Sequence, residues 1–122
     1  MPGPKRSVRV GGQLKAALAE LLTRDVSDPR LANVVVTRVD LTDDLSLLTA
    51  RVRMLEGGDD DARRKQTMRA LERASGMLKR ELAARVKTRI VPNVRFFYDE
   101  GQDHTTRVEE LLREIASEKK ST

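Results

Sequence analysis

The sequence predicts an α+β domain in which a three-stranded sheet carries helices on one face. Helical periodicity dominates near the N-terminus, in the centre and near the C-terminus. Three shorter segments instead alternate apolar and polar residues, which is the period of a strand with one wet face. The 122 residues suffice for one hydrophobic core, and no linker, repeat or low-complexity block indicates a second domain.

Residues 1–7 are rich in Pro, Gly and basic side chains and predict a flexible basic leader. The first helix follows, with a leucine stripe on one face, formed by Leu14, Leu18, Leu21 and Leu22. Gly11 and Gly12 would each cost about 1 kcal/mol inside a helix, so this helix either starts near Gln13 or is weakened at the glycines. Asp28-Pro29 should end it, because a residue before proline disfavours the helical region.

An antiparallel hairpin is predicted next. The segment Val34–Leu41 is rich in β-branched residues and places three side chains on one face, Thr37, Val39 and Leu41. Thr42-Asp43-Asp44 forms the turn. The second strand has an apolar face of alternate residues, formed by Leu48, Ala50, Val52 and Met54.

The longest helical pattern runs from about Asp60 to Val86. Its apolar face is a single stripe at helical spacing, made up of Met68, Leu71, Ser75, Leu78, Leu82 and Val86. Gly76 interrupts the pattern, and a glycine costs about 1 kcal/mol relative to alanine inside a helix. We therefore expect a kink, a junction of two helices or the close approach of another backbone at Gly76.

A third strand and a short last helix complete the predicted order, α-β-β-α-α-β plus a C-terminal helix. Val94, Phe96 and Tyr98 alternate with polar or exposed positions, as in a strand. Helical spacing returns over Thr106–Ser117. The domain is thus expected over residues 8–116, with a polar tail over residues 117–122.

The net charge of +5 is concentrated in one part of the chain. Between Arg63 and Arg95 there are eleven basic and two acidic residues, so this stretch carries +9. On a helical wheel, the face opposite the apolar stripe holds Gly76 and four cations, Arg69, Arg73, Arg80 and Lys87. Spaced cations suit a phosphate backbone, and a glycine lets a phosphate reach N–H groups at a helix N-terminus. The alternative is a solvated face without a partner.

The polar face of the sheet gives a weaker indication. Arg51, Arg53 and Arg95 either extend a binding surface or guard a sheet edge, and the second interpretation is favoured. Phe97 is the one aromatic residue expected on this face, so a platform for reading stacked bases is not predicted. Recognition of a nucleic acid would therefore use its backbone and shape.

Composition argues against an enzyme and against a metal site. The chain has no cysteine and one histidine, His104, which excludes thiolate nucleophiles, cysteine-ligated zinc and a histidine-rich metal site. The run Asp59-Asp60-Asp61 lacks the spacing of a calcium loop and suits a helix cap. No apolar run approaches the roughly 18 residues of a membrane span, and the N-terminal residues lack the apolar block of a secretory signal. We expect a cytoplasmic protein without a cofactor.

Several motifs resemble the bacterial ribosome-binding factor A family. They occur in the expected order and cover about residues 6–116. The motifs are Asp28-Pro29-Arg30-Leu31, VDLTDDL over residues 39–45, Ala74-Ser75-Gly76 followed by Leu78 and Arg80-Glu81-Leu82, Arg89-Ile90-Val91-Pro92, FFYDE over residues 96–100 and RVEELLREI over residues 107–115.

The resemblance implies a KH-like (type II) RNA-binding domain in which Ala74-Ser75-Gly76 forms a helix-kink-helix element in place of the usual Gly-x-x-Gly loop. It further implies a monomeric, non-catalytic assembly factor that binds free small (30S) ribosomal subunits. Such a factor contacts 16S rRNA near its 5′ end and decoding region and supports late maturation and 5′-end processing, especially in the cold. Charge pattern and resemblance together predict these RNA-binding residues: Arg69, Arg73, Ala74, Ser75, Gly76, Lys79, Arg80, Lys87 and Arg89.

Two other functions stay open on the sequence. A protein-interaction module without direct RNA binding could use the exposed face of the sheet or the C-terminal helix. A ribonuclease acting on precursor rRNA would need an acid–base pair, for which the chain offers His104 and distant aspartates.

Overall fold

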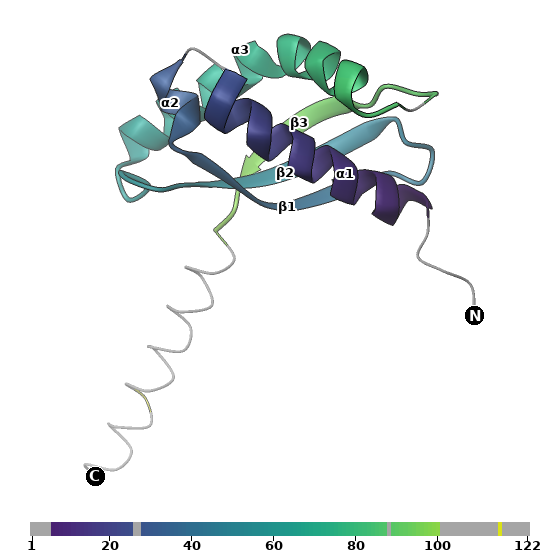
Figure 1. Cartoon of the computed structure of the whole chain (residues 1–122). Helices are drawn as coiled ribbons and strands as arrows, with labels where there is room; N and C mark the ends of the chain where they lie inside the picture. Colours follow the sequence, from purple (N-terminus) through teal and green to yellow (C-terminus); the bar gives the residue numbers. More distant parts are fainter. Residues whose placement is uncertain (1–5, 26–27, 88, 101–114, 116–122) are drawn as a thin grey trace.

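The computed structural model describes residues 6–25, 28–87, 89–100 and 115, and it has two layers, with helices covering one face of a three-stranded sheet (Figure 1). The helices are α1 (Arg6–Glu20), α2 (Pro29–Ala32) and α3 (Asp61–Arg85), and a π-helical segment, η1 (Leu21–Asp25), follows α1. The strands are β1 (Val34–Leu41), β2 (Leu47–Met54) and β3 (Asn93–Tyr98). This arrangement confirms the predicted α+β architecture.

The strands lie in the order β1-β2-β3, with β1 antiparallel and β3 parallel to β2. A parallel pair needs a crossover connection, and α3 provides it. A bulge between Val36 and Arg38 shifts the alternation of β1, so that Val36 before it and Val39 after it both pack towards the helices. Thr37 lies at the bulge, where its hydroxyl donates to Asp99 Oδ2 (2.6 Å).

Hydrogen bonds to Asp44 hold the turn between β1 and β2. The carboxylate accepts from Thr42 Oγ1 (2.7 Å), from Ser46 Oγ (2.7 Å) and from the Ser46 backbone N–H (3.1 Å). These bonds, that from the Ser46 hydroxyl above all, lower the pKa of Asp44 below its usual value of 3.8. The next residue, Leu45, has a φ of 63° and a buried side chain. The turn thereby fixes Ser46 at the entrance of β2.

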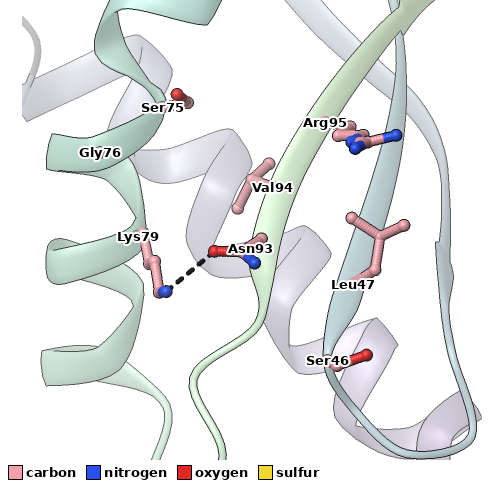
Figure 2. A pocket seen from close by; sticks show the side chains of 8 residues that line it. All are labelled: Ser46, Leu47, Ser75, Gly76, Lys79, Asn93, Val94 and Arg95. Carbon is pink, nitrogen blue, oxygen red and sulfur yellow. Dashed lines mark hydrogen bonds between the residues drawn. The ribbon is translucent and has the colours of Figure 1, made fainter.

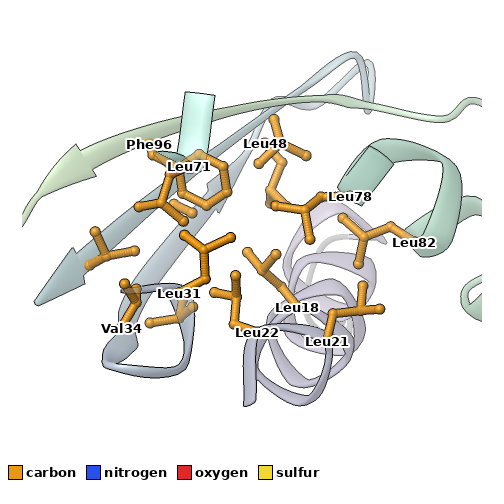
Figure 3. Packing of buried hydrophobic residues seen from close by; sticks show 14 of the residues in the cluster. Leu18, Leu21, Leu22, Leu31, Val34, Leu48, Leu71, Leu78, Leu82 and Phe96 are labelled. Carbon is orange, nitrogen blue, oxygen red and sulfur yellow. The ribbon is translucent and has the colours of Figure 1, made fainter. Parts of the chain in front are cut away.

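The core lies between the helices and the sheet (Figure 3). Leucines from α1, η1, α2 and α3 pack against Leu48 and Phe96 of the sheet. The largest fully buried side chains are Leu14, Leu18, Leu21, Leu22, Leu31, Leu48, Val52, Leu71, Leu78 and Leu82. Both apolar stripes predicted from helical spacing therefore face the core, although Met68 and Ser75 of the second stripe are half-buried.

α1 begins at Arg6, inside the predicted leader, and continues through Gly11 and Gly12. Of the two predicted alternatives, a helix start near Gln13 is therefore wrong. Packing of the leucine stripe on the sheet stabilises the helix by more than the two glycines cost. Gly11 faces β1, where an added Cβ would lie 3.6 Å from Leu41 Cβ, whereas Gly12 faces open space.

Asp28-Pro29 begins α2, a short helix that the sequence analysis missed. Asp28 Oδ1 accepts from the Arg30 backbone N–H (3.0 Å), and Pro29 occupies the first turn, where its missing N–H costs nothing. The Arg30 guanidinium lies 2.8 Å from the same carboxylate and, chiefly through this hydrogen bond, lowers the pKa of Asp28. The pair was interpreted as the stop of the first helix, whereas in the structure it starts α2, three residues after η1 ends at Asp25.

The predicted C-terminal helix over Thr106–Ser117 and the polar tail lie outside the described residues, apart from Ile115. Among the described helices, none combines the length and the apolar character needed to cross a membrane.

Candidate nucleic-acid interface

α3 positions most of the predicted RNA-binding residues. Asp60 caps its N-terminus, with Oδ1 accepting from the backbone N–H groups of Ala62 (3.0 Å) and Arg63 (3.3 Å). Burial of Leu71, Leu78 and Leu82 fixes the rotation of α3 about its axis. The opposite side of α3 therefore faces away from the sheet.

Three cations on this outward side form what we call the α3 ridge: Arg69, Arg73 and Arg80. All three side chains are exposed, as the helical wheel predicts, and Lys87, the fourth predicted cation, is exposed beyond the end of the helix. Within the described part of the chain, none of them has an acidic partner, whereas Arg64 pairs with Glu100 and Arg85 approaches Glu20. Uncompensated positive charge on one side of a helix creates a local potential that attracts polyanions.

α3 continues through Gly76 as one helix, so the predicted junction of two helices is wrong. The neighbouring residues favour helix, and the burial of Leu78 and Leu82 offsets the cost of about 1 kcal/mol for the glycine. No helix begins at Gly76, so the predicted binding of phosphate by N–H groups of a helix N-terminus there is wrong too. What Gly76 provides is a bare stretch of helix surface, with Arg80 Nη1 4.0 Å from the place a Cβ would take.

A groove of about 460 Å³ lies between α3 and β3, beside the α3 ridge (Figure 2). We call it the α3–β3 groove; it is lined by Ser46, Leu47, Ser75, Gly76, Lys79, Asn93, Val94 and Arg95. Lys79 Nζ donates to Asn93 Oδ1 (2.9 Å) across it. The Ser75 hydroxyl donates to the Glu72 carbonyl (2.6 Å) within α3. Hydroxyl, amide and ammonium groups at this spacing suit a nucleic-acid backbone or a base edge.

The structure divides eight of the nine predicted site residues into three groups. Arg69, Arg73 and Arg80 lie on the ridge, while Ser75, Gly76 and Lys79 line the groove beside it. Lys87 and Arg89 are exposed beyond Val86, where α3 ends.

Ala74 is the predicted residue that falls outside this surface, because its side chain is half-buried against the core. Sequence reasoning missed Ser46 and Asn93 as parts of the groove. They come from a turn and from the first position of a strand, where no periodic pattern identifies a ligand-binding residue. Arg95 had been assigned to the sheet face, and it borders the groove as well.

In the described ranges, no group of three His, Cys, Asp or Glu side chains is placed to hold a metal ion. His104 lies outside the described residues.

Residues 6–112 match the family model described as ribosome-binding factor A. The chain is 50% identical over 111 residues to ribosome-binding factor A of Sorangium cellulosum, a match that covers 91% of this chain and 89% of the relative. It is 37% identical over 114 residues to ribosome-binding factor A of Macrococcus caseolyticus, covering 93% and 97% of the two chains.

A crystal structure and a fitted homology model of a relative have the same fold. The crystal structure of ribosome-binding factor A from Thermus thermophilus superposes with a TM-score of 0.64 at 34% identity, covering 75% of this chain and 94% of that chain. A homology model of the Thermus thermophilus protein, fitted into a cryo-EM map of a 30S–RbfA complex, superposes with a TM-score of 0.59 at 35% identity, covering 75% and 92%.

Proposed function

The chain belongs to the ribosome-binding factor A family, and from this premise we propose that it binds the small (30S) ribosomal subunit through 16S rRNA as a non-catalytic assembly factor. The 30S complex of the Thermus thermophilus relative supports this choice of partner. The protein acts as a monomer in the cytoplasm, on free subunits rather than on translating ribosomes. It supports late maturation of the subunit and processing of the 5′ end of 16S rRNA, especially in the cold.

The observation that carries the proposal is the α3 ridge, with exposed cations that have no acidic partner within the described chain. Arg69 and Arg73 lie one helical turn apart, and Arg80 lies about 10.5 Å further along the axis. One side of the helix can therefore follow several phosphates of an RNA backbone. Lys79 in the adjoining groove adds a donor on the side towards β3.

The RNA-binding unit extends from α1 to about residue 116 in this proposal. α1, η1 and the sheet act as the scaffold that fixes the rotation of α3, because their buried leucines hold its inner face. The groove residues Ser75, Gly76 and Lys79 contact the RNA together with the ridge, and Lys87 and Arg89 extend the contact beyond the helix end.

The proposal is tested by substituting the three helical cations of the ridge, as Arg69→Gln, Arg73→Gln and Arg80→Gln in one variant. Binding to purified 30S subunits is measured over a range of salt concentrations. Each phosphate contact contributes roughly one unit to the slope of log affinity against log salt, so the triple variant should lose about three units. Thermal stability should stay near that of the parent, because all three side chains are exposed.

A matched control removes three exposed cations from elsewhere, as Arg6→Gln, Arg9→Gln and Arg24→Gln. This control has the same net charge as the ridge variant, so it separates the position of the charge from its amount. If both variants lose the same salt slope, or if the ridge variant binds as the parent does, the ridge is not the docking surface.

A protein-interaction module is the second candidate, favoured by apolar side chains exposed to solvent at Leu55 (69%) and Phe97 (48%). It predicts that capture of the 30S partner survives nuclease treatment of the subunit. Direct binding to RNA predicts that nuclease abolishes capture.

A further inference from the structure

The open face of the sheet, which carries no described helix, has its own cationic and aromatic cluster. β2 and β3 bury alternate side chains under the helices, including Ala50, Val52 and Phe96. The intervening side chains of Arg51, Arg95 and Phe97 are exposed on the other face. In Figure 2 the side chain of Arg95 points away from α3.

The register of the parallel pair brings these three residues together. Arg51 lies directly opposite Phe97, and Thr49 lies opposite Arg95. Neighbouring strands are about 4.8 Å apart, and residues two apart on a strand are separated by roughly 6.6 Å. Phe97, whose side chain is 48% exposed, therefore has an arginine beside it on β2 and another two positions back along β3.

The charge on this face is predominantly positive. Within the described residues, Arg51 and Arg95 have no acidic partner. Three acids lie near the cluster. Asp40 lies 3.4 Å from Arg38 on β1, Asp99 accepts from the Thr37 hydroxyl, and Glu72 of α3 lines a small pocket together with Arg95 and Phe97. Flexible guanidinium groups around an exposed aromatic ring are the combination that holds single-stranded RNA, with a base on the ring and phosphates on the arginines.

We propose that Arg51, Arg95 and Phe97 form a second RNA contact, which stacks one base of a single-stranded segment on Phe97 and binds the flanking phosphates. This inference rests on the proposed function for the class of its ligand. The α3 ridge lies on the helical layer and the new cluster on the sheet layer, and the α3–β3 groove, which Arg95 also borders, lies between them. The protein can then hold two RNA segments at once, and binding of the first raises the effective concentration of the second.

The test is an NMR titration of the full chain with a uridine decamer at low salt, which resolves the two surfaces residue by residue. Amide signals of Arg51, Arg95 and Phe97 should shift, and so should those of the ridge. In the ridge variant (Arg69, Arg73 and Arg80 to Gln), the sheet signals should still shift. In the Arg51→Gln/Arg95→Gln variant they should not, and the salt slope should fall by about 1.4, or 0.7 for each lost phosphate contact.

Phe97→Leu isolates the ring, because leucine keeps an apolar side chain at this exposed position. When Phe97→Leu is added to the ridge variant, the loss of base stacking should weaken binding of the decamer at least about fivefold relative to the ridge variant alone. The matched control for charge is Arg9→Gln/Arg24→Gln. In this variant, RNA should shift the amide signals of the sheet as in the parent, with the same titration midpoint.

Three results would overturn the second contact: sheet signals that RNA does not move, equal binding by Phe97→Leu, or an equal response to a glutamate decamer. The last would assign the face to an acidic protein instead of RNA. Failure of the proposed function is distinguishable, because then the ridge signals stay in place while the sheet signals move.

Discussion

α1 and α3 cover the same face of the sheet and both contain glycine, yet their outer surfaces differ. α1 carries Gly12 and Gln13 outward, with basic residues near its start and an acid at its end. α3 carries three arginines outward on one side. Their inner faces both stabilise the core, because each buries leucines against the sheet. Burial therefore constrains only one side of a helix, and the other side is available for binding.

The largest expected effect lies on the shared inner side. Leu18→Ala in α1 and Leu78→Ala in α3 each leave a cavity in the core, since both side chains are fully buried. Each variant should lose about 2–5 kcal/mol of unfolding free energy, measured by urea denaturation. A clearly smaller loss of unfolding free energy in one of the two variants would show that the core can collapse around that site. The inner faces of α1 and α3 would then not be equivalent.

Alanine substitutions of Gly12 in α1 and Gly76 in α3 should have the same effect on stability but different effects on binding. Gly12 faces open space, and a Cβ at Gly76 would approach only Arg80 Nη1, at 4.0 Å, among the atoms beyond the local helix backbone. Gly12→Ala and Gly76→Ala should therefore each raise the unfolding free energy by about 0.5–1 kcal/mol. Binding to 30S subunits should weaken several-fold for Gly76→Ala alone, because a Cβ covers the bare surface beside the ridge. Unchanged affinity would mean that the ligand does not approach Gly76.

The smallest expected change in stability concerns the turn between β1 and β2. The turn contacts α1 through the bond from Ser7 to Asp43 Oδ1 (3.2 Å) and supplies Ser46 to the α3–β3 groove. Asp44→Ala removes the bonds that hold this turn and should lower the melting temperature slightly at pH 7. Asp59→Ala, an exposed aspartate in another turn, is the matched control.

The effect of Asp44→Ala should depend on pH in a defined direction. The pKa of Asp44 is depressed in the folded protein, so its contribution to stability is present above the ordinary value of 3.8. It is lost as the pH falls through the lower pKa of the folded state. Melting curves of parent and variant should therefore converge in strong acid, and a difference that persists there would point to packing of the turn.

Elements with one dominant local signal were predictable. Strand alternation placed β2 and β3, because each has one buried and one exposed face. Helical spacing identified the buried leucines of α3 and, by elimination, the exposed cations opposite them. Two predictions missed what the tertiary structure shows. Asp28-Pro29 starts α2, and Gly76 lies inside a helix that its neighbours maintain.

The sequence by itself determined the fold class, the apolar faces and the side of α3 that carries the cations, because periodicity and charge are local properties of the chain. Tertiary structure decided that β3 lies parallel to β2, that Asn93 reaches Lys79 across a groove and that Arg51 lies beside Phe97. These contacts join residues that are far apart in sequence. Their geometry depends on how the shared core fixes the rotation and register of each element, which no local pattern encodes.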